Sequence, residues 1–341
     1  MKRIRKIILN LILFIALIVL TFSIIFKDQD MSQMLSIVQS VKKEFVLVGI
    51  LCMFLFISCE AINIGRTLKE LGEKSSFYRN LKYALIGFFF SSITPAASGG
   101  QPMQIYYMHR DRISVSSSTL ALLVNLTSAQ IVTISVALIS LIFNYSYMNG
   151  VLITFFIVGV LLNASALSLL LISIYSKRLS TGLINFAIKV MKFFRIKNIQ
   201  EKQEKLQNEL NKYHDSAMYI RNNRRIVLRI ILTTYIQYLT YYSITYWTYR
   251  AFGFSEHSIF KIITMQSVLY ATVSGIPSPG AVGVSEGGYL AIFETIYPKA
   301  TLSGAMLLNR GINFYLFVAF SAIVVIINAM RGKKEAKKVN D

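Results

Sequence analysis

The sequence predicts an all-α polytopic membrane protein, as judged from its composition, its apolar runs and the placement of its basic residues. Hydrophobic residues make up 54% of the 341 residues and charged residues only 15%, whereas soluble domains carry about 25% charged residues. Apolar runs of about 20 residues recur along the chain, and each could cross roughly 30 Å of hydrocarbon. We therefore expect a single transmembrane domain that extends over residues 1–341.

Six apolar runs are predicted to be full crossings of the bilayer. They lie at residues 6–26, 45–64, 118–143, 151–175, 226–249 and 302–330. The first run follows a basic N-terminus and is longer than the apolar core of a signal peptide, so we expect a retained helix. The polar segment 176–225 is expected to form cytosolic or interfacial helices that connect the two halves or contact anionic lipid.

Two other apolar stretches, at residues 83–103 and 259–288, are interrupted by Pro and Gly. Pro removes a backbone donor and Gly weakens a helix, so neither stretch is expected to be one continuous helix. We predict two broken, re-entrant helical hairpins, and ordinary kinked helices are the alternative. Backbone groups freed at membrane depth need polar partners, so two such breaks imply a polar interior site.

The two breaks share a pattern that indicates an inverted repeat. Each has a small polar residue and Pro, then a Gly-rich turn, then an amide or carboxylate side chain, Gln101 or Glu286. In the predicted topology they enter from opposite sides, as in inverted-repeat transporters. Helix N-termini that open after such turns suit a phosphate group. The candidate lipid-binding residues of the breaks are Pro95, Gly99, Gly100, Gln101, Pro277, Pro279, Gly280, Gly283 and Glu286.

The basic residues predict the orientation of the chain. Most of the 36 Lys and Arg residues fall in the segments 1–6, 65–82, 109–114, 176–225 and 331–341. Because cytoplasmic segments carry an excess of Lys and Arg, both termini are expected on the cytoplasmic side of a bacterial cell membrane. Nearly all of the net charge of +20 lies in these segments, which favours topology and anionic-lipid contact, and nucleic acid is not an expected partner.

Charged residues within the predicted spans are further candidates. Glu286 and Arg310 are expected to pair, because charges at membrane depth are expensive and usually paired. Arg310 either holds the second hairpin or meets a lipid phosphate, for which its planar guanidinium is suited. Tyr315 lies close by in the sequence and joins these candidates.

Other polar residues at depth allow two interpretations each. Glu60 lies near the cytoplasmic end of the second span, and Arg66 follows six residues later at the interface. Arg66 either snorkels there as a structural residue or contacts lipid. The polar residues at 125–130 either join helices or line a cavity. No metal or cofactor is expected, because the two Cys and three His residues do not form a ligand pattern.

At these motifs the sequence resembles the lysylphosphatidylglycerol synthase/flippase transmembrane family. Residues 277–286, Pro-Ser-Pro-Gly-Ala-Val-Gly-Val-Ser-Glu, look like the family's Pro-x-Pro-Gly-Gly-x-Gly-x-x-Glu signature. Residues 94–106, and Arg310 with Tyr315, are similar to its other motifs. The sequence departs from the family at Gln101, where an acidic residue is frequent, and near Gln104, where a basic residue is frequent.

The resemblance implies movement of an aminoacylated or other anionic phospholipid, such as lysyl-phosphatidylglycerol, across the cytoplasmic membrane. It also implies a contribution to surface charge and to resistance against cationic antimicrobial peptides. In two-domain members a soluble domain transfers lysine from lysyl-tRNA to phosphatidylglycerol. That acyltransferase domain is expected to be absent here. The alternatives are a phosphatidylglycerol lysyltransferase, as the family name implies, or a non-transporting partner of a separate synthase. A homo-oligomer is compatible with each of these functions.

Overall fold

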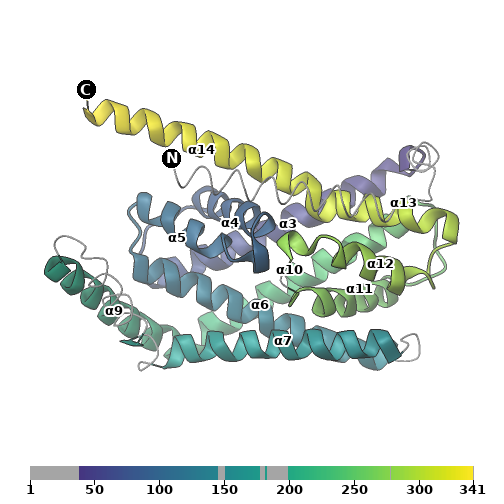
Figure 1. Ribbon diagram of the computed structural model, residues 1–341, viewed down its shortest axis with the longest axis horizontal. Coiled ribbons are helices and arrows are strands. Elements are labelled where there is room, and N and C mark those ends of the chain that lie inside the picture. Colours follow the sequence, from purple (N-terminus) through teal and green to yellow (C-terminus); the bar gives the residue numbers. More distant parts are fainter. Residues whose placement is uncertain (1–37, 145–149, 177–180, 183–198, 277, 341) are drawn as a thin grey trace.

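The computed structural model describes residues 38–144, 150–176, 181–182, 199–276 and 278–340, and in these ranges every regular element is a helix (Figure 1). The all-helical fold class predicted from the sequence is confirmed. The predicted first span, residues 6–26, and the candidate Pro277 lie outside the described residues.

Four helices of the described part of the chain are long and apolar enough to cross a membrane. They are α3 (Lys43–Glu70), α6 (Val115–Asn144), α7 (Gly150–Tyr175) and the continuous run Lys299–Met330. They correspond to the predicted crossings 45–64, 118–143, 151–175 and 302–330. Their exposed surfaces carry large apolar side chains such as Leu51 and Leu161, as a lipid environment requires.

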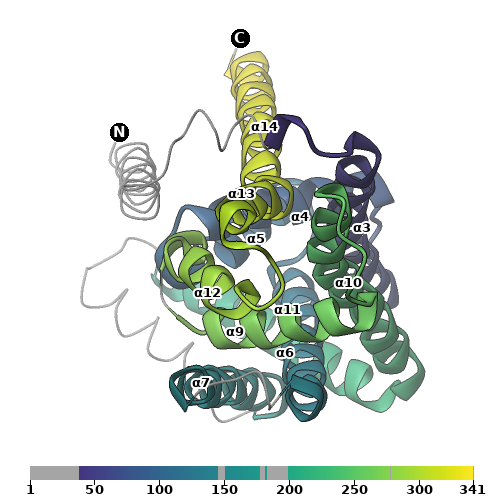
Figure 2. The ribbon, with the colours of Figure 1, turned by 90° about the vertical axis from the view of Figure 1, so that its right-hand side faces the viewer.

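The predicted crossing 226–249 forms the helix α10 (Arg224–Ala251), but it is less apolar than these four. Its outer edge is apolar, with Leu228, Leu232 and Ile236 exposed. Its other faces bury polar residues against α3, α6 and α11. Because α3, α6 and α11 cover these faces, protein rather than lipid surrounds the buried Thr, Gln and Tyr side chains of α10. Figure 2 shows α10 beside α3, and α6 beside α7.

The first predicted re-entrant stretch is a helical hairpin, named here the first hairpin. It consists of α4 (Phe77–Ser92), a 3-10 turn (Pro95–Ala97) and α5 (Gly100–Arg110). The Ser76 hydroxyl accepts the Arg79 N–H and so caps α4. The 16 residues of α4 extend for about 24 Å, which is less than the roughly 30 Å hydrocarbon core.

The second hairpin repeats this order of elements. It consists of α11 (Ile259–Val273), a 3-10 turn (Pro279–Ala281) and α12 (Val284–Phe293). The two hairpins lie in opposite halves of the long axis of the molecule, and their 3-10 turns contact each other near its middle (Figure 1). Neither stretch is one kinked helix, so the hairpin prediction is confirmed and its alternative is wrong.

The last crossing differs from the single helix that the sequence predicts. The helix α13 (Lys299–Arg310) passes into a π-helical segment (Gly311–Tyr315), from which α14 (Leu316–Asn340) continues. Single π turns inside α-helices occur frequently at functional sites. Here the π turn lies beside the second hairpin.

The polar segment 176–225 is described mainly as the helix α9 (Ile199–Asn222). The Glu209 carboxylate accepts the backbone N–H of Ser116, at the start of α6. The Tyr213 hydroxyl donates to the carbonyl of Ser173, near the end of α7. The helix therefore connects to the ends of α6 and α7, while residues 177–180 and 183–198 lie outside the described part.

Candidate functional site

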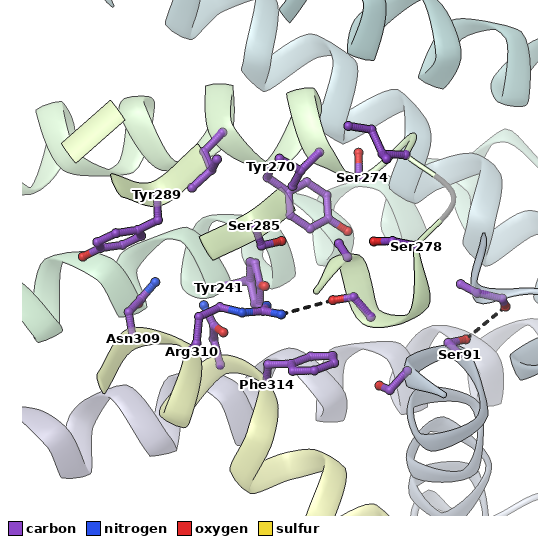
Figure 3. A pocket seen from close by; sticks show the side chains of 18 of the residues that line it. Ser91, Tyr241, Tyr270, Ser274, Ser278, Ser285, Tyr289, Asn309, Arg310 and Phe314 are labelled. Atoms are coloured by element: carbon purple, nitrogen blue, oxygen red, sulfur yellow. Dashed lines mark hydrogen bonds between the residues drawn. The ribbon is translucent and has the colours of Figure 1, made fainter. Parts of the chain in front are cut away.

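A cavity of about 240 Å³ lies where the tips of the two hairpins meet (Figure 3). Its wall consists of residues from both hairpins, α10, α13 and the π turn. Its polar lining consists of Ser91, Ser92, Tyr241, Gln266, Tyr270, Ser274, Ser278, Ser285, Tyr289, Asn309, Arg310 and Asn313. The sequence argument that two breaks share a polar interior pocket is therefore supported by the geometry.

The two tips share part of their backbone conformation. Pro95 and Pro279 each begin a 3-10 turn, where the fixed φ of proline is compatible with the first helical position. Ala97 and Ala281, the third residues of these turns, both have positive φ, 53° and 52°. Because residues other than glycine rarely adopt this conformation, its occurrence at both tips indicates a structural repeat and not only a repeat of composition.

A buried ion pair fastens the second hairpin to α13. Arg310 Nε donates to Glu286 Oε1 at 2.8 Å, and both side chains are buried. Arg310 also donates to the carbonyl oxygen of Gly280 at 3.1 Å, the bond drawn in Figure 3. The second carboxylate oxygen of Glu286 accepts the N–H of Gly283 at 2.7 Å. The predicted Glu286–Arg310 pair is confirmed, and it holds the turn as well as the helix after it.

The π turn brings a third group to the same carboxylate. The Tyr315 hydroxyl donates to Glu286 Oε1 at 2.9 Å. In an α-helix Arg310 and Tyr315 would lie about 140° apart around the axis, at 3.6 residues per turn. The π segment between them carries one extra residue per turn, so residues five apart come close to one face. The local helix distortion thus explains how Arg310 and Tyr315 both reach Glu286.

Aromatic packing completes the wall beside Arg310. The guanidinium lies over the ring of Phe314 at 4.2 Å, a cation–π contact. Gly280 has a φ of 60°, and a methyl group on it would overlap the Phe314 ring. Arg310 is the one charged residue in the cavity lining, and the other polar groups are hydroxyls and amides. Such a set can donate hydrogen bonds to one anionic group, such as a phosphate.

The first hairpin uses a different residue from the one predicted. Gln104 is buried, and its amide nitrogen donates to Glu60 Oε1 at 3.1 Å. Gln101 is half-buried and lies outside the cavity lining. The helix α5 begins after Gly99, and therefore its third residue, Pro102, matches Glu286 in position. The sequence comparison that matched Gln101 to Glu286 was therefore wrong by one position. The alignment of the two hairpins depends on where α5 and α12 begin.

A polar side chain of α7 satisfies backbone at the second break. The buried amide of Asn163 donates to the carbonyl of Ala271 at 3.0 Å and to the Ser274 hydroxyl at 3.1 Å. Gly159, one turn earlier, leaves no room for a side chain against Ala271 and Thr272. Helices approach closely at small residues in membranes, so α7 supports the end of α11. Sequence reasoning missed Asn163, although a lone Asn in an apolar run was a visible signal.

Arg66 lies away from the cavity. Its guanidinium donates to the backbone oxygen of Arg229 at 2.9 Å and to the Thr233 hydroxyl at 2.8 Å. These bonds join α3 to α10. The geometry therefore favours the structural interpretation of Arg66 over the lipid-contact interpretation.

The polar residues at 125–130 include an interhelical junction. The hydroxyls of Ser128 and Thr234 are 3.0 Å apart, and the Asn63 amide donates to Thr234 at 3.0 Å. This cluster connects α3, α6 and α10, as polar side chains do between membrane helices. It does not line the cavity between the hairpins.

The remaining candidates at the tips have positional roles. Gly99, Gly100 and Pro95 belong to the first tip but are outside the cavity lining, as are Pro279 and Gly283 of the second. The tyrosines Tyr241 and Tyr270 do line the cavity. The sequence did not single them out, because Tyr241 is one of several tyrosines on α10 and Tyr270 lies within the apolar run of α11.

Two comparisons with known proteins extend these observations. The family model described as "Lysylphosphatidylglycerol synthase TM region" matches residues 7–321. A "UPF0104 membrane protein" of Archaeoglobus fulgidus is 20% identical over 317 residues, which cover 91% of this chain and 94% of that protein. The matched region includes both hairpins, α13 and the π turn.

Proposed function

Because this chain belongs to the lysylphosphatidylglycerol synthase transmembrane family, we propose that it is a flippase-like carrier of phospholipid. In this proposal it binds the phosphate-bearing headgroup of an anionic or aminoacylated phospholipid and moves it between the leaflets of the cytoplasmic membrane. Exchange of such lipids would change the charge of the outer surface. The cavity between the two hairpin tips is the observation that carries the proposal.

The chemistry of the cavity suits a phosphate diester. Glu286 and Gly280 accept two of the five N–H groups of the Arg310 guanidinium. Its planar fork can present others to phosphate oxygens, and serine and tyrosine hydroxyls surround it. Glu286 compensates the charge of Arg310, so the cavity wall does not hold an unpaired buried cation.

The arrangement of the hairpins suits alternating access. Each hairpin approaches the cavity from its own end of the molecule, and the two tips contact each other there. A small movement of one tip against the other would open the cavity toward one side at a time. Paired broken helices of this kind surround the substrate in inverted-repeat transporters.

A leaflet-exchange assay tests the proposal. The purified protein is reconstituted into vesicles of phosphatidylcholine and phosphatidylglycerol that contain a fluorescent phosphatidylglycerol, and an impermeant reductant then bleaches the outer leaflet. We expect bleaching of both leaflets with the natural chain. Ser285→Phe should fill the cavity beside Arg310 and protect the inner leaflet.

The matched control is Ser165→Phe on α7, where the serine is exposed on the outer surface. It should exchange lipid at the rate of the natural chain. Equal exchange by Ser285→Phe, or no exchange by the folded natural chain with fluorescent phosphatidylglycerol and lysyl-phosphatidylglycerol, contradicts the proposal. Repeating the assay with fluorescent phosphatidylcholine measures whether the headgroup charge matters.

A further inference from the structure

A second acidic side chain, Glu60, lies outside the cavity and has a different setting from the Glu286–Arg310 pair. Glu60 lies close to the middle of α3 and is only partly buried. Its carboxylate accepts a hydrogen bond from the buried amide of Gln104. A methyl group on Gly87 would overlap that amide, so α4 leaves a space that holds Gln104 in place.

Glu60 has no ion pair within the described residues. The titratable groups that face it are Tyr238 of α10 and Tyr270 of α11. The helix α5 presents only the amide of Gln104, and no charged group of α4, α6 or the π turn in the described ranges interacts with Glu60. Arg66, on the same helix, bonds to α10 instead.

A carboxylate in this position favours a proton as its partner. An unpaired charge at membrane depth has a large free-energy cost, and a carboxylate avoids this cost when it binds a proton. A hard metal cation would need several oxygen ligands around it. The Gln104 amide that bonds to the carboxylate instead presents an N–H group, which suits a carboxylate or a carboxyl group but not a metal ion.

A layer of tyrosines connects Glu60 with the lipid cavity. The ring of Tyr270 lies 5.6 Å from that of Tyr238 and 5.6 Å from that of Tyr241. Tyr270 and Tyr241 line the cavity, and Tyr270 is also within electrostatic reach of Glu60. The charge of Glu60 therefore affects the electrostatic potential near the cavity. Neutralising it would make the cavity more favourable for an anionic phosphate, because like charges repel in a medium of low dielectric constant.

We propose that Glu60 is a proton-binding site that couples the movement of lipid to the proton gradient across the membrane. One proton adds to the carboxylate oxygen on the side where lipid enters and leaves after the lipid has crossed, and no other bond forms or breaks. The coupling part of this inference rests on the proposed carrier function, whereas the proton site itself does not.

The proton site is tested without any transport measurement. Infrared difference spectra of the full chain in vesicles, recorded between acidic and basic pH, report carboxyl groups that gain or lose a proton. We expect a carboxyl band that is missing from Glu60→Gln and retained in Glu294→Gln, a control at an exposed glutamate of α12's end. A difference spectrum unchanged by Glu60→Gln would overturn the proton site.

The coupling is tested in the same vesicles with a pH difference across the membrane. One proton per lipid allows an about tenfold accumulation of fluorescent phosphatidylglycerol in one leaflet per pH unit. The natural chain and Glu294→Gln should accumulate the lipid, while Glu60→Gln should distribute it evenly. Accumulation by Glu60→Gln, even distribution by the natural chain, or accumulation driven by a sodium gradient would each refute the coupling. If no variant moves lipid, the carrier function fails and the infrared result still decides the proton site.

Discussion

The two hairpins share a backbone turn but are fastened by different chemistry. In the second hairpin a buried ion pair holds the tip itself, because Arg310 bonds to Glu286 and to the turn carbonyl of Gly280. In the first hairpin the ion pairs lie at the opposite end, at its base, and near the tip the neutral amide of Gln104 bonds to Glu60. There the Asp111 carboxylate bonds to Lys82 and to the Tyr83 hydroxyl, the latter at 2.6 Å.

This difference indicates which tip is held rigidly and which tip can move. The tip of the first hairpin is held by neutral groups, such as the Thr94 hydroxyl, which accepts the Gly99 N–H at 2.9 Å. Neutral hydrogen bonds contribute about 1 kcal/mol each, and breaking a buried ion pair costs several times more. We therefore interpret the second hairpin as the fixed wall of the cavity and the first as the moving one.

The largest expected effect comes from removing the charge that holds the second tip. Arg310→Ala leaves the Glu286 carboxylate buried without its cation, and we expect a loss of about 3–5 kcal/mol of folding free energy. Thermal unfolding in detergent measures it. The counterpart in the first hairpin, Gln104→Leu, should cost only about 1–3 kcal/mol, the value of a hydrogen bond to a charged group.

Two further variants keep this comparison interpretable. Arg225→Ala removes an exposed arginine of α10 and should change stability by less than about 0.5 kcal/mol. Arg310→Met combined with Glu286→Gln removes both charges and should be less destabilised than Arg310→Ala alone. Equal stability of Arg310→Ala and Arg225→Ala would remove the distinction between the two tips.

An intermediate effect is expected from packing at the second turn. Gly280→Ala places a methyl group into the Phe314 ring at a residue with positive φ. Backbone strain of about 1–2 kcal/mol then adds to overpacking of about 1–3 kcal/mol. Gly72→Ala is the matched control, because Gly72 has a φ of 77° but open space around it. The difference between the two melting curves isolates the packing against Phe314, and its absence would show that the ring moves aside.

The smallest effect concerns the base of the first hairpin. Burial alone would raise the pKa of Asp111, but hydrogen bonds from Lys82 and Tyr83, together with the charges of Lys82 and Arg79, hold it below its usual range. With a depressed pKa in the folded state, this stabilisation is complete above the unfolded pKa of about 3.9. It is lost as the pH falls through the folded value.

Asp111→Asn therefore tests the base as a pH-dependent contact. Because the site is partly exposed, we expect a contribution of at most about 1 kcal/mol. The stability of the natural chain should exceed that of Asp111→Asn at pH 7, and the two should converge below about pH 4. A stability difference that is independent of pH would contradict the electrostatic origin of this contact.

The sequence predicted the charged half of the site better than the neutral half. Glu286 and Arg310 were expected to pair because two opposite charges in apolar segments have few other options. Asn163 was not identified, and the partner of Gln104 was not predicted, because an amide can bond to another helix, to its own backbone or to water. Arg66 was ambiguous for the same reason, and the structure places it between α3 and α10.

By itself the sequence determined the fold class, the approximate positions of four long apolar helices and the positions of the two breaks. These features depend on hydrophobicity and on the local chemistry of Pro and Gly, which act over a few residues. Only the tertiary structure decided that the tips meet, that a π turn brings Tyr315 beside Arg310, and that α10 packs its polar side chains against α3, α6 and α11. These features depend on contacts between residues far apart in the chain, and on which surface faces protein instead of lipid.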